Sequence, residues 1–341
     1  MNEILLTKHR VCIPIDCLLL IVLCSTEVHA GRAVAAQTDG GYGQIRIVTI
    51  NVWSGLDYHG SLHFGEYETA VRRELRFRLL LRQVKALDPD VLFVQEANPV
   101  DRFSSRLAAS LSFDETHQVC NAGIKFAGFG PPFNFEEGIA ILARKNLGLK
   151  KHSAWKLSGG LGLYGDDATL NFDEAEFAQV ARIRVNGRPV FLVNVHLSAF
   201  PPRDSVTVKE LKRLLLNGSI GSEKASTADE FLSYGSLRRQ REVRELLENM
   251  NDLPSDVPLI LGGDFNSEID SKEISMLLED GNFTIADRDS GISHIYTWDP
   301  IRNENVSYSM RPFDAGGHTL DPAGRIAAAY DSKPSRVRIR R

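Results

Sequence analysis

Cysteine is scarce outside the N-terminal end of this chain. Three of the four cysteines, Cys12, Cys17 and Cys24, lie within the first thirty residues, and only Cys120 lies beyond them. One cysteine cannot form an internal disulfide, so the rest of the chain depends on a hydrophobic core for its stability. With 341 residues, 43% of them hydrophobic and 25% charged, the chain can build such a core. Its composition is far from that of disordered or fibrous proteins.

An excess of positive charge is also lacking. Lysine and arginine number 40 against 44 aspartates and glutamates, which leaves a formal net charge of −4. A nucleic-acid-binding domain usually shows an excess of basic residues or a basic face, so the overall charge does not indicate one. A local basic groove is the remaining way in which the protein could bind nucleic acid. No Ser-His-Asp or Cys-His arrangement is evident either, which argues against a covalent acyl mechanism.

The N-terminal segment has no apolar run of the roughly 20 residues that a membrane helix needs. A basic stretch at residues 8–10 precedes the apolar run CLLLIVLC at residues 17–24, and small or modest side chains follow at residues 28–30. This layout is typical of a secretory signal peptide. We therefore predict that residues 1–30 are cleaved and that the protein is secreted or periplasmic. The alternative is a segment that stays attached as a membrane anchor.

The remaining sequence predicts one α/β domain over residues 44–341, after a small, Gly-rich linker at residues 31–43. Short apolar runs predict strands, and apolar residues at three- and four-residue spacing predict helices. Two similar strand–helix–strand units result, as expected when helices cover the sheets. Strands are expected at 45–53, 91–94, 138–144, 190–197 and 258–261, and helices at 71–87 and around 243–250. Residues 201–235 are expected to form a polar surface insertion with a helical piece near 211–216.

Polar residues follow four of the predicted strands, at the point where each strand ends. Ligands of α/β proteins gather at the carboxyl ends of strands, so these residues are expected to converge on one cleft. Glu96 and Asp264 are hard oxygen ligands, and Asn51 or Asn266 can add amide oxygens, a set that favours Mg²⁺, Mn²⁺ or Ca²⁺ over zinc. His196 can donate a hydrogen bond to a phosphate held by such an ion.

Each of these residues also has a purely structural interpretation. Asn51 can satisfy backbone groups in a turn, and Glu96 can be the acidic residue of a helix N-terminus. A histidine at a strand end, such as His196, is more often structural than catalytic. The segment Gly262–Asn266 (GGDFN) can be a glycine turn with local hydrogen bonds. The combination, in this order along the chain, is what favours a functional site.

The segments TINVW, PDVLFVQE, EGIAILARK, VNVHL and LGGDFNS together resemble the endonuclease/exonuclease/phosphatase family over roughly residues 44–300. The resemblance implies a DNase I-like fold, a four-layer α-β-β-α sandwich with two mixed sheets. It implies that Glu96 is the main metal ligand, that Asn51 and Asp264 join the metal site, and that Asp264 also orients or activates water. His196 would contact the scissile phosphate, and Asn266 would bind phosphate. Gln95 would belong to the supporting residues.

The C-terminal end departs from the family pattern, which closes with an Asp-His pair after a hydrophobic strand. No Asp-His dipeptide follows Asp264, and the chain ends in the basic residues 336–341. Thr297-Trp298 resembles the aromatic turn that precedes the last strands of the family. We therefore expect the domain to lack its last strands, through a frameshift near Arg336. The alternative is that His318 substitutes for the missing histidine.

These observations predict a Mg²⁺-dependent hydrolase, with Mn²⁺ as the other metal, that cleaves phosphodiester or phosphomonoester bonds. Export fits a phospholipid or extracellular nucleic acid, a small phosphoester is the further substrate class, and no protein partner is predicted. The missing Asp-His segment would impair activity. The alternative is a catalytically inactive member of the fold that binds an anionic or phosphorylated partner.

Overall fold

The computed structural model describes residues 23–25, 44–55, 69–121, 124–126, 136–160, 168–170, 175–199, 222–267, 271–285 and 336–338, with a few helical residues between 209 and 216. The strands are β1 Leu23–Ser25, β2 Gln44–Asn51, β3 Val91–Ala97, β4 Phe113–Asn121, β5 Ile124–Phe126, β6 Glu137–Arg144, β7 Lys150–Ser158, β8 Ala168–Leu170, β9 Glu176–Val185, β10 Arg188–His196, β11 Leu259–Asp264, β12 Phe283–Ile285 and β13 Arg336–Arg338. The helices are α1 Ala70–Leu87, α2 Val100–Leu111, α4 Ser222–Met250 and α5 Lys272–Glu279, with a short 3-10 helix at Lys145–Leu147.

Two mixed β-sheets form the centre of the molecule. The first has the order β12-β1-β11-β10-β9-β7, in which only β10 and β11 run parallel. The second has the order β13-β2-β3-β6-β4, in which only β2 and β3 run parallel. The strands β5 and β8 form a separate antiparallel pair. Each large sheet therefore has one parallel pair whose two carboxyl ends lie side by side.

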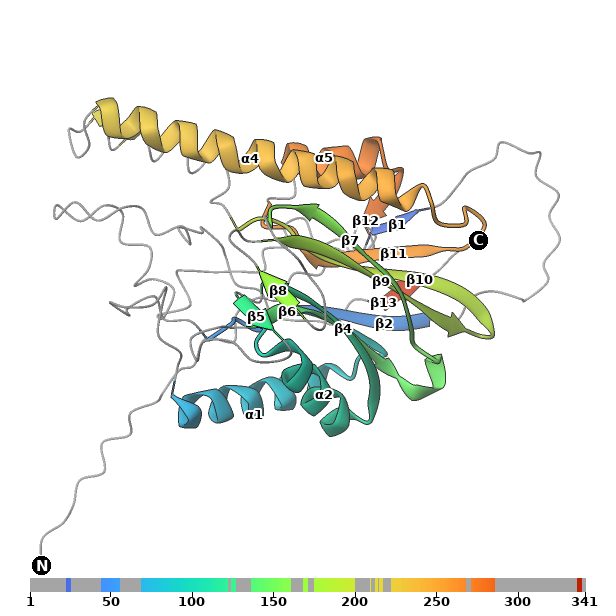
Figure 1. Ribbon diagram of the computed structural model, residues 1–341. Helices are drawn as coiled ribbons and strands as arrows, with labels where there is room; N and C mark the ends of the chain where they lie inside the picture. Colours follow the sequence, from blue (N-terminus) through green and yellow to red (C-terminus); the bar gives the residue numbers. More distant parts are fainter. Residues whose placement is uncertain are drawn as a thin grey trace, which may run out of the picture.

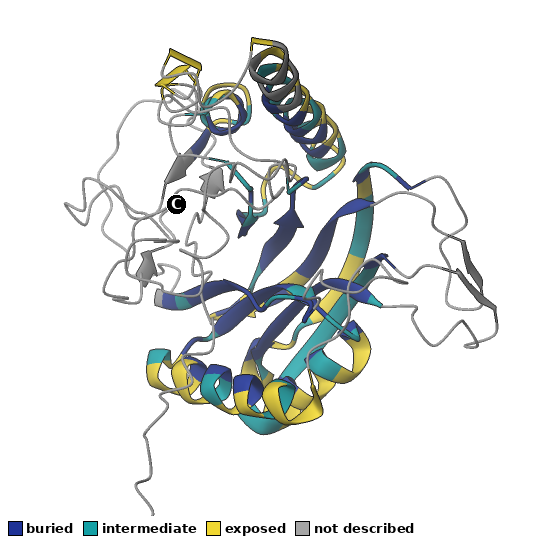
Figure 2. Ribbon diagram, turned by 90° about the vertical axis from the view of Figure 1, so that its left-hand side faces the viewer, coloured by how far each residue is buried: buried dark blue, intermediate teal, exposed yellow. Residues whose placement is uncertain are grey.

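Layers of buried apolar side chains hold the two sheets and the helices together. One lies between the sheets and includes Ile47, Phe93, Ile183 and Leu192. A second packs α1 and α2 against the β2-β3-β6 sheet, and a third packs α4 and α5 against β10 and β11. The molecule is thus a four-layer α-β-β-α sandwich, with α1 and α2 below and α4 and α5 above in Figure 1. Figure 2 shows the buried residues concentrated in the two sheets. The fold expected from the sequence is confirmed.

The predicted strands and the first predicted helix are also confirmed, with their ends shifted by at most three residues. The first helix begins after Thr69, whose side-chain oxygen accepts a hydrogen bond from the backbone nitrogen of Arg72 at 3.3 Å. It ends at Asp88, whose left-handed backbone closes the last turn before Pro89.

The predicted polar insertion over residues 201–235 is wrong from residue 222 onward. There α4 begins and runs for 29 residues, although residues 212–213 and 215–216 are helical as expected. The inner face of α4 includes Leu232, Arg239 and Glu242, all buried. Two of these three are charged, so the apolar pattern that indicates a helix is interrupted there and becomes clear only from Val243.

Two short strands come from the ends of the chain. The strand β1 pairs antiparallel with β11 and with β12, although it lies inside the segment predicted as a signal peptide. The strand β13, from the basic C-terminal tail, pairs antiparallel with Gln44–Arg46 of β2. The linker at 31–43, Thr297-Trp298 and His318 lie outside the described residues.

Among the helices in the described ranges, none has both the length and the apolar composition needed to cross a membrane.

Candidate functional site

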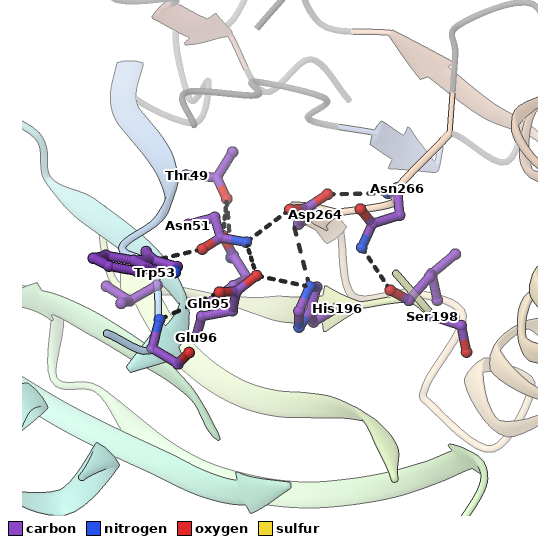
Figure 3. Close-up of polar contacts among 12 residues, drawn as sticks. Thr49, Asn51, Trp53, Gln95, Glu96, His196, Ser198, Asp264 and Asn266 are labelled. Atoms are coloured by element: carbon purple, nitrogen blue, oxygen red, sulfur yellow. Dashed lines mark hydrogen bonds and ion pairs between the residues drawn. The ribbon is translucent and has the colours of Figure 1, made fainter. Parts of the chain in front are cut away.

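The residues expected to converge do so at the carboxyl ends of the two parallel strand pairs. In one sheet, Asn51 at the end of β2 lies in register with Gln95 of β3. In the other, His196 at the end of β10 lies in register with Asp264 at the end of β11. Figure 3 shows the side chains of Asn51, Glu96, His196 and Asp264 pointing toward one another from the two facing sheets.

Asn51 joins the two carboxylates of the cluster. Its side-chain nitrogen donates to Glu96 Oε1 at 2.6 Å and to Asp264 Oδ2 at 3.0 Å. The amide orientation follows from its other end, because Asn51 Oδ1 accepts a hydrogen bond from the backbone nitrogen of Trp53 at 2.9 Å. In this orientation Asn51 orients the carboxylates as a donor, and its predicted role as a metal ligand stays a prediction.

His196 faces both carboxylates without hydrogen-bonding either of them. Its Nε2 atom lies 3.8 Å from Glu96 Oε1 and 4.0 Å from Asp264 Oδ2. Those distances exceed hydrogen-bond length, and the buried Nε2 atom has no hydrogen-bond partner. A buried polar atom without a partner is costly and needs an explanation. A ligand that accepts a hydrogen bond at this point would supply the missing partner.

Asp264 and Asn266 form the second half of the cluster. The backbone nitrogen of Asn266 donates to Asp264 Oδ1 at 3.0 Å, which leaves Asp264 Oδ2 directed at Asn51 and His196. The Asn266 side-chain nitrogen donates to the backbone oxygen of Leu197 at 2.8 Å. Asn266 therefore fastens β11 to the segment after β10, and its predicted phosphate contact stays a prediction.

Gln95 is a supporting residue in this structure. Its side-chain nitrogen donates to Thr49 Oγ1 at 3.0 Å and to Asn194 Oδ1 at 2.7 Å. The Asn194 side chain in turn donates to the backbone oxygens of Val94 and Ala140, in the opposite sheet. Sequence reasoning missed Asn194. The available signal was an amide in the middle of the apolar run VFLVNVHL, where a polar residue must find buried partners.

The backbone is unusual where it carries the site. Trp53, Glu96 and Asn266 all have positive φ angles, of 59°, 55° and 47°, a region that residues with a Cβ atom rarely adopt. Glu96 also lies where the register between β3 and β6 shifts, and such bulges redirect a side chain. Local strain of this kind concentrates at functional sites.

Gly263 is required by close packing of β11 against β10. A Cβ atom at this position would lie 2.0 Å from the backbone oxygen of Val195, and the φ angle of 143° already disfavours other residues. The absence of a side chain lets Asp264 and His196 approach each other at the strand ends.

The donor set suits a hard divalent cation such as Mg²⁺. Glu96 and Asp264 are both carboxylates with side chains only 14% exposed, and a cation between them would offset their mutual repulsion. Across the described part of the chain, no group of three or more His, Cys, Asp or Glu side chains is arranged to hold a metal. Magnesium often uses one or two protein carboxylates, with waters and substrate phosphate oxygens as its other ligands. The residues present therefore fit the ion.

Comparisons with solved structures give distant similarities, of which three are described. The human Nocturnin catalytic domain with bound sulfate is 19% identical, with 69% of this chain and 70% of that chain covered and a TM-score of 0.41. The Bacteroides thetaiotaomicron mannosyl-6-phosphatase Bt3783 is 15% identical, with 70% and 71% covered and a TM-score of 0.42. D. rerio TDP2 complexed with single-strand DNA product is 16% identical, with 77% of each chain covered and a TM-score of 0.42. At such identities no substrate can be carried over.

A comparison with curated proteins finds no significant match. The family model described as Endonuclease/Exonuclease/phosphatase family matches residues 48–312, which include every residue of the site. Nucleases and phosphatases of this kind hydrolyse phosphoesters, so the match supports a hydrolase. The chain belongs to the endonuclease/exonuclease/phosphatase family, as its sequence motifs predict.

Proposed function

We propose that the protein is a Mg²⁺-dependent hydrolase that cleaves phosphodiester bonds. One observation carries the proposal: two carboxylates from opposite sheets, Glu96 and Asp264, are held by one amide nitrogen of Asn51 beside a buried, unpartnered His196 Nε2. Two acidic groups and one histidine ring nitrogen at the ends of parallel strands suit a cation and a phosphate together.

The protein groups have separate roles in this proposal. Glu96 and Asp264 would hold Mg²⁺, which polarises a phosphoryl oxygen and stabilises negative charge on the leaving group. His196 Nε2 would donate to a non-bridging phosphate oxygen. Asn51 keeps the two carboxylate oxygens in place, and Asp264, whose Oδ1 is held by the Asn266 nitrogen, would orient the attacking water.

The substrate we propose is a phosphodiester met outside the cell, in a phospholipid or a nucleic acid. Support for this location comes from the signal-like N-terminal segment, and the overall charge of −4 gives no support to a general nucleic-acid binder. The two substrates differ in behaviour: nucleic-acid binding falls steeply as salt rises, whereas lipid hydrolysis needs vesicles or detergent.

The proposal is tested with the full-length protein, bis(p-nitrophenyl) phosphate and Mg²⁺, compared with an EDTA-treated sample and with Glu96→Gln. We expect turnover that is lost with EDTA and falls at least about 100-fold in Glu96→Gln, because the metal contributes several kcal/mol to the transition state. Glu245→Gln is the matched control, since Glu245 is an exposed carboxylate whose side-chain partner is Asn249 on the same helix.

Calorimetric titration with Mg²⁺ separates the enzyme from the non-catalytic alternative. Metal binding without turnover by a folded wild-type protein would contradict hydrolysis and favour a protein that binds an anionic or phosphorylated partner. Equal turnover in wild type and Glu96→Gln would show that the reaction takes place elsewhere.

A further inference from the structure

Two buried charged residues of α4 lie next to the site. Glu242 is 0% exposed and Arg239 is 1% exposed, although both side chains ordinarily carry charge. Burial holds the pKa of the Arg239 guanidinium below its ordinary value, and the carboxylates of Glu273 and Glu242 only partly offset this effect. Buried charges persist only where partners compensate the loss of water. The groups that bind Arg239 and Glu242 therefore indicate the role of these two residues.

Both charged groups bind the same residue, Ser198, which follows His196 by two positions. Glu242 Oε2 accepts from the backbone nitrogen of Ser198 at 3.0 Å, and Glu242 Oε1 accepts from the Ser198 hydroxyl. Arg239 Nη1 donates to the backbone oxygen of Ser198 at 3.3 Å. The Arg239 Nε atom lies 3.4 Å from Glu273 Oε1 of α5, which holds the guanidinium from the other side.

The preceding residue, Leu197, is held from the opposite direction. Its backbone nitrogen donates to the backbone oxygen of Asp264 at 2.9 Å, and its backbone oxygen accepts from the Asn266 side chain at 2.8 Å. All four backbone polar groups of Leu197 and Ser198 are therefore bound, two by the end of β11 and two by α4. The segment joins α4 to His196, Asp264 and Asn266.

We propose that Glu242 and Arg239 are positioning residues, which hold the Leu197-Ser198 segment and thereby set where His196 Nε2 and Asn266 lie relative to Asp264. The inference rests on the proposed function, and it gives a role in that function to two residues that lie more than 40 positions from His196 in the sequence. A displacement of about 1 Å at a reacting group can lower the rate about 100-fold, so such a connection would affect catalysis as well as stability.

The two serines that bind Glu242 provide a matched test. Ser158 Oγ on β7 donates to Glu242 Oε1, as Ser198 Oγ does, but Ser158 lies outside the segment after His196. We expect Ser198→Ala and Ser158→Ala to lower Tm to a similar extent. Only Ser198→Ala should lower kcat for the phosphodiester, by about tenfold, with KM unchanged, and Ser158→Ala should stay within about twofold of wild type.

A second readout does not depend on turnover. In protein labelled with ¹⁵N-histidine, the imidazole signals of His196, assigned with His196→Ala, report the surroundings of Nε2. Ser198→Ala and Glu242→Gln should shift these signals, whereas Ser158→Ala should leave them in place. If the wild type shows no hydrolysis, the proposed function fails while the NMR comparison still tests the positioning role.

Equal behaviour of the two serine variants would overturn the inference. Identical effects on kcat, or on the His196 signals in an inactive protein, would mean that Arg239 and Glu242 only anchor α4 to the sheet. The serine comparison stands even if Glu242→Gln fails to fold.

Discussion

At the scale of single residues, most polar side-chain atoms of the site are already used in hydrogen bonds within the protein. Asn51, Asp264 and Asn266 each use polar atoms to hold a neighbour, and His196 Nε2 is left without a partner. In the proposed function this unpartnered atom contacts the substrate, and the neighbouring hydrogen bonds hold the residues around it in place.

His196 is expected to act on the substrate and not on the metal. His196→Ala should lower kcat about 10²–10⁴-fold, since it removes a positioned donor at the reacting phosphate. The dissociation constant for Mg²⁺, measured by calorimetry in the absence of substrate, should change less than about threefold. A large loss of Mg²⁺ affinity would instead make His196 a metal ligand.

Gly263 is expected to tolerate no side chain. In Gly263→Ala the new Cβ would meet the backbone oxygen of Val195 at 2.0 Å, so β11 must move away from β10. We expect a loss of about 2–4 kcal/mol in the free energy of unfolding, from the overpacking and the positive φ together.

Gly187→Ala is the comparison variant for Gly263→Ala. Gly187 also has a positive φ, of 78°, but no atom lies within 4 Å of the point that its Cβ would occupy, so only the backbone term of about 1–2 kcal/mol is lost. Urea unfolding measures both losses. Equal losses would mean that the strands adapt to the added methyl group.

At the scale of secondary-structure elements, polar contacts join α2 to β4. Burial raises the pKa of the Glu115 carboxyl, but hydrogen bonds from His117, Ser105 and Ser104 outweigh it and hold the pKa below its ordinary value. A carboxyl whose pKa is depressed by folding stabilises the protein above its unfolded pKa, and this contribution is lost as the pH falls through the folded pKa.

The Glu115 contribution should therefore disappear under acidic conditions. Because glutamate in an unfolded chain has a pKa of about 4.3, Glu115→Gln should be less stable than wild type at pH 7 and should approach wild type at about pH 3–4. Urea midpoints at the two pH values measure the difference. A constant difference across this range would mean that the loss comes from packing and not from ionisation.

The elements that sequence reasoning found and missed differ in one physical respect. Strands β3, β10 and β11 each contain a run of apolar residues and β2 is rich in β-branched residues, so their composition alone indicates them. The first half of α4 buries Arg239 and Glu242, which a pattern of apolar residues cannot show. Arg238 on the same helix pairs with Glu242, and the other partners, Ser198 and Glu273, come from outside α4.

At the scale of the whole molecule, β1 covers part of the edge of β11. Leu23 and Cys24 pair with Leu261 and Ile260, and β12 joins the sheet only through β1. Cleavage of the predicted signal peptide after residue 30 would remove this strand. An uncovered strand edge presents unpaired backbone groups that can pair with another chain.

A chain comprising residues 31–341 is therefore expected to differ from the full-length protein. It should unfold at a lower temperature and should associate in a concentration-dependent way, measured by thermal unfolding and by light scattering after gel filtration. The same Tm and the same monomeric mass for both proteins would show that β1 contributes nothing to the sheet.

The sequence by itself determined the family, the strands that end in polar residues, and the set Asn51, Glu96, His196, Asp264 and Asn266. Apolar runs and motif residues are local in the chain, so no three-dimensional information is needed to find them. Only the tertiary structure decided which atoms of these side chains face the site and which residues hold them. The hydrogen bond from Asn51 to Asp264 joins positions 213 residues apart. Such pairs, like those of Asn194 and Glu242, exist only because two sheets and a helix bring distant segments together.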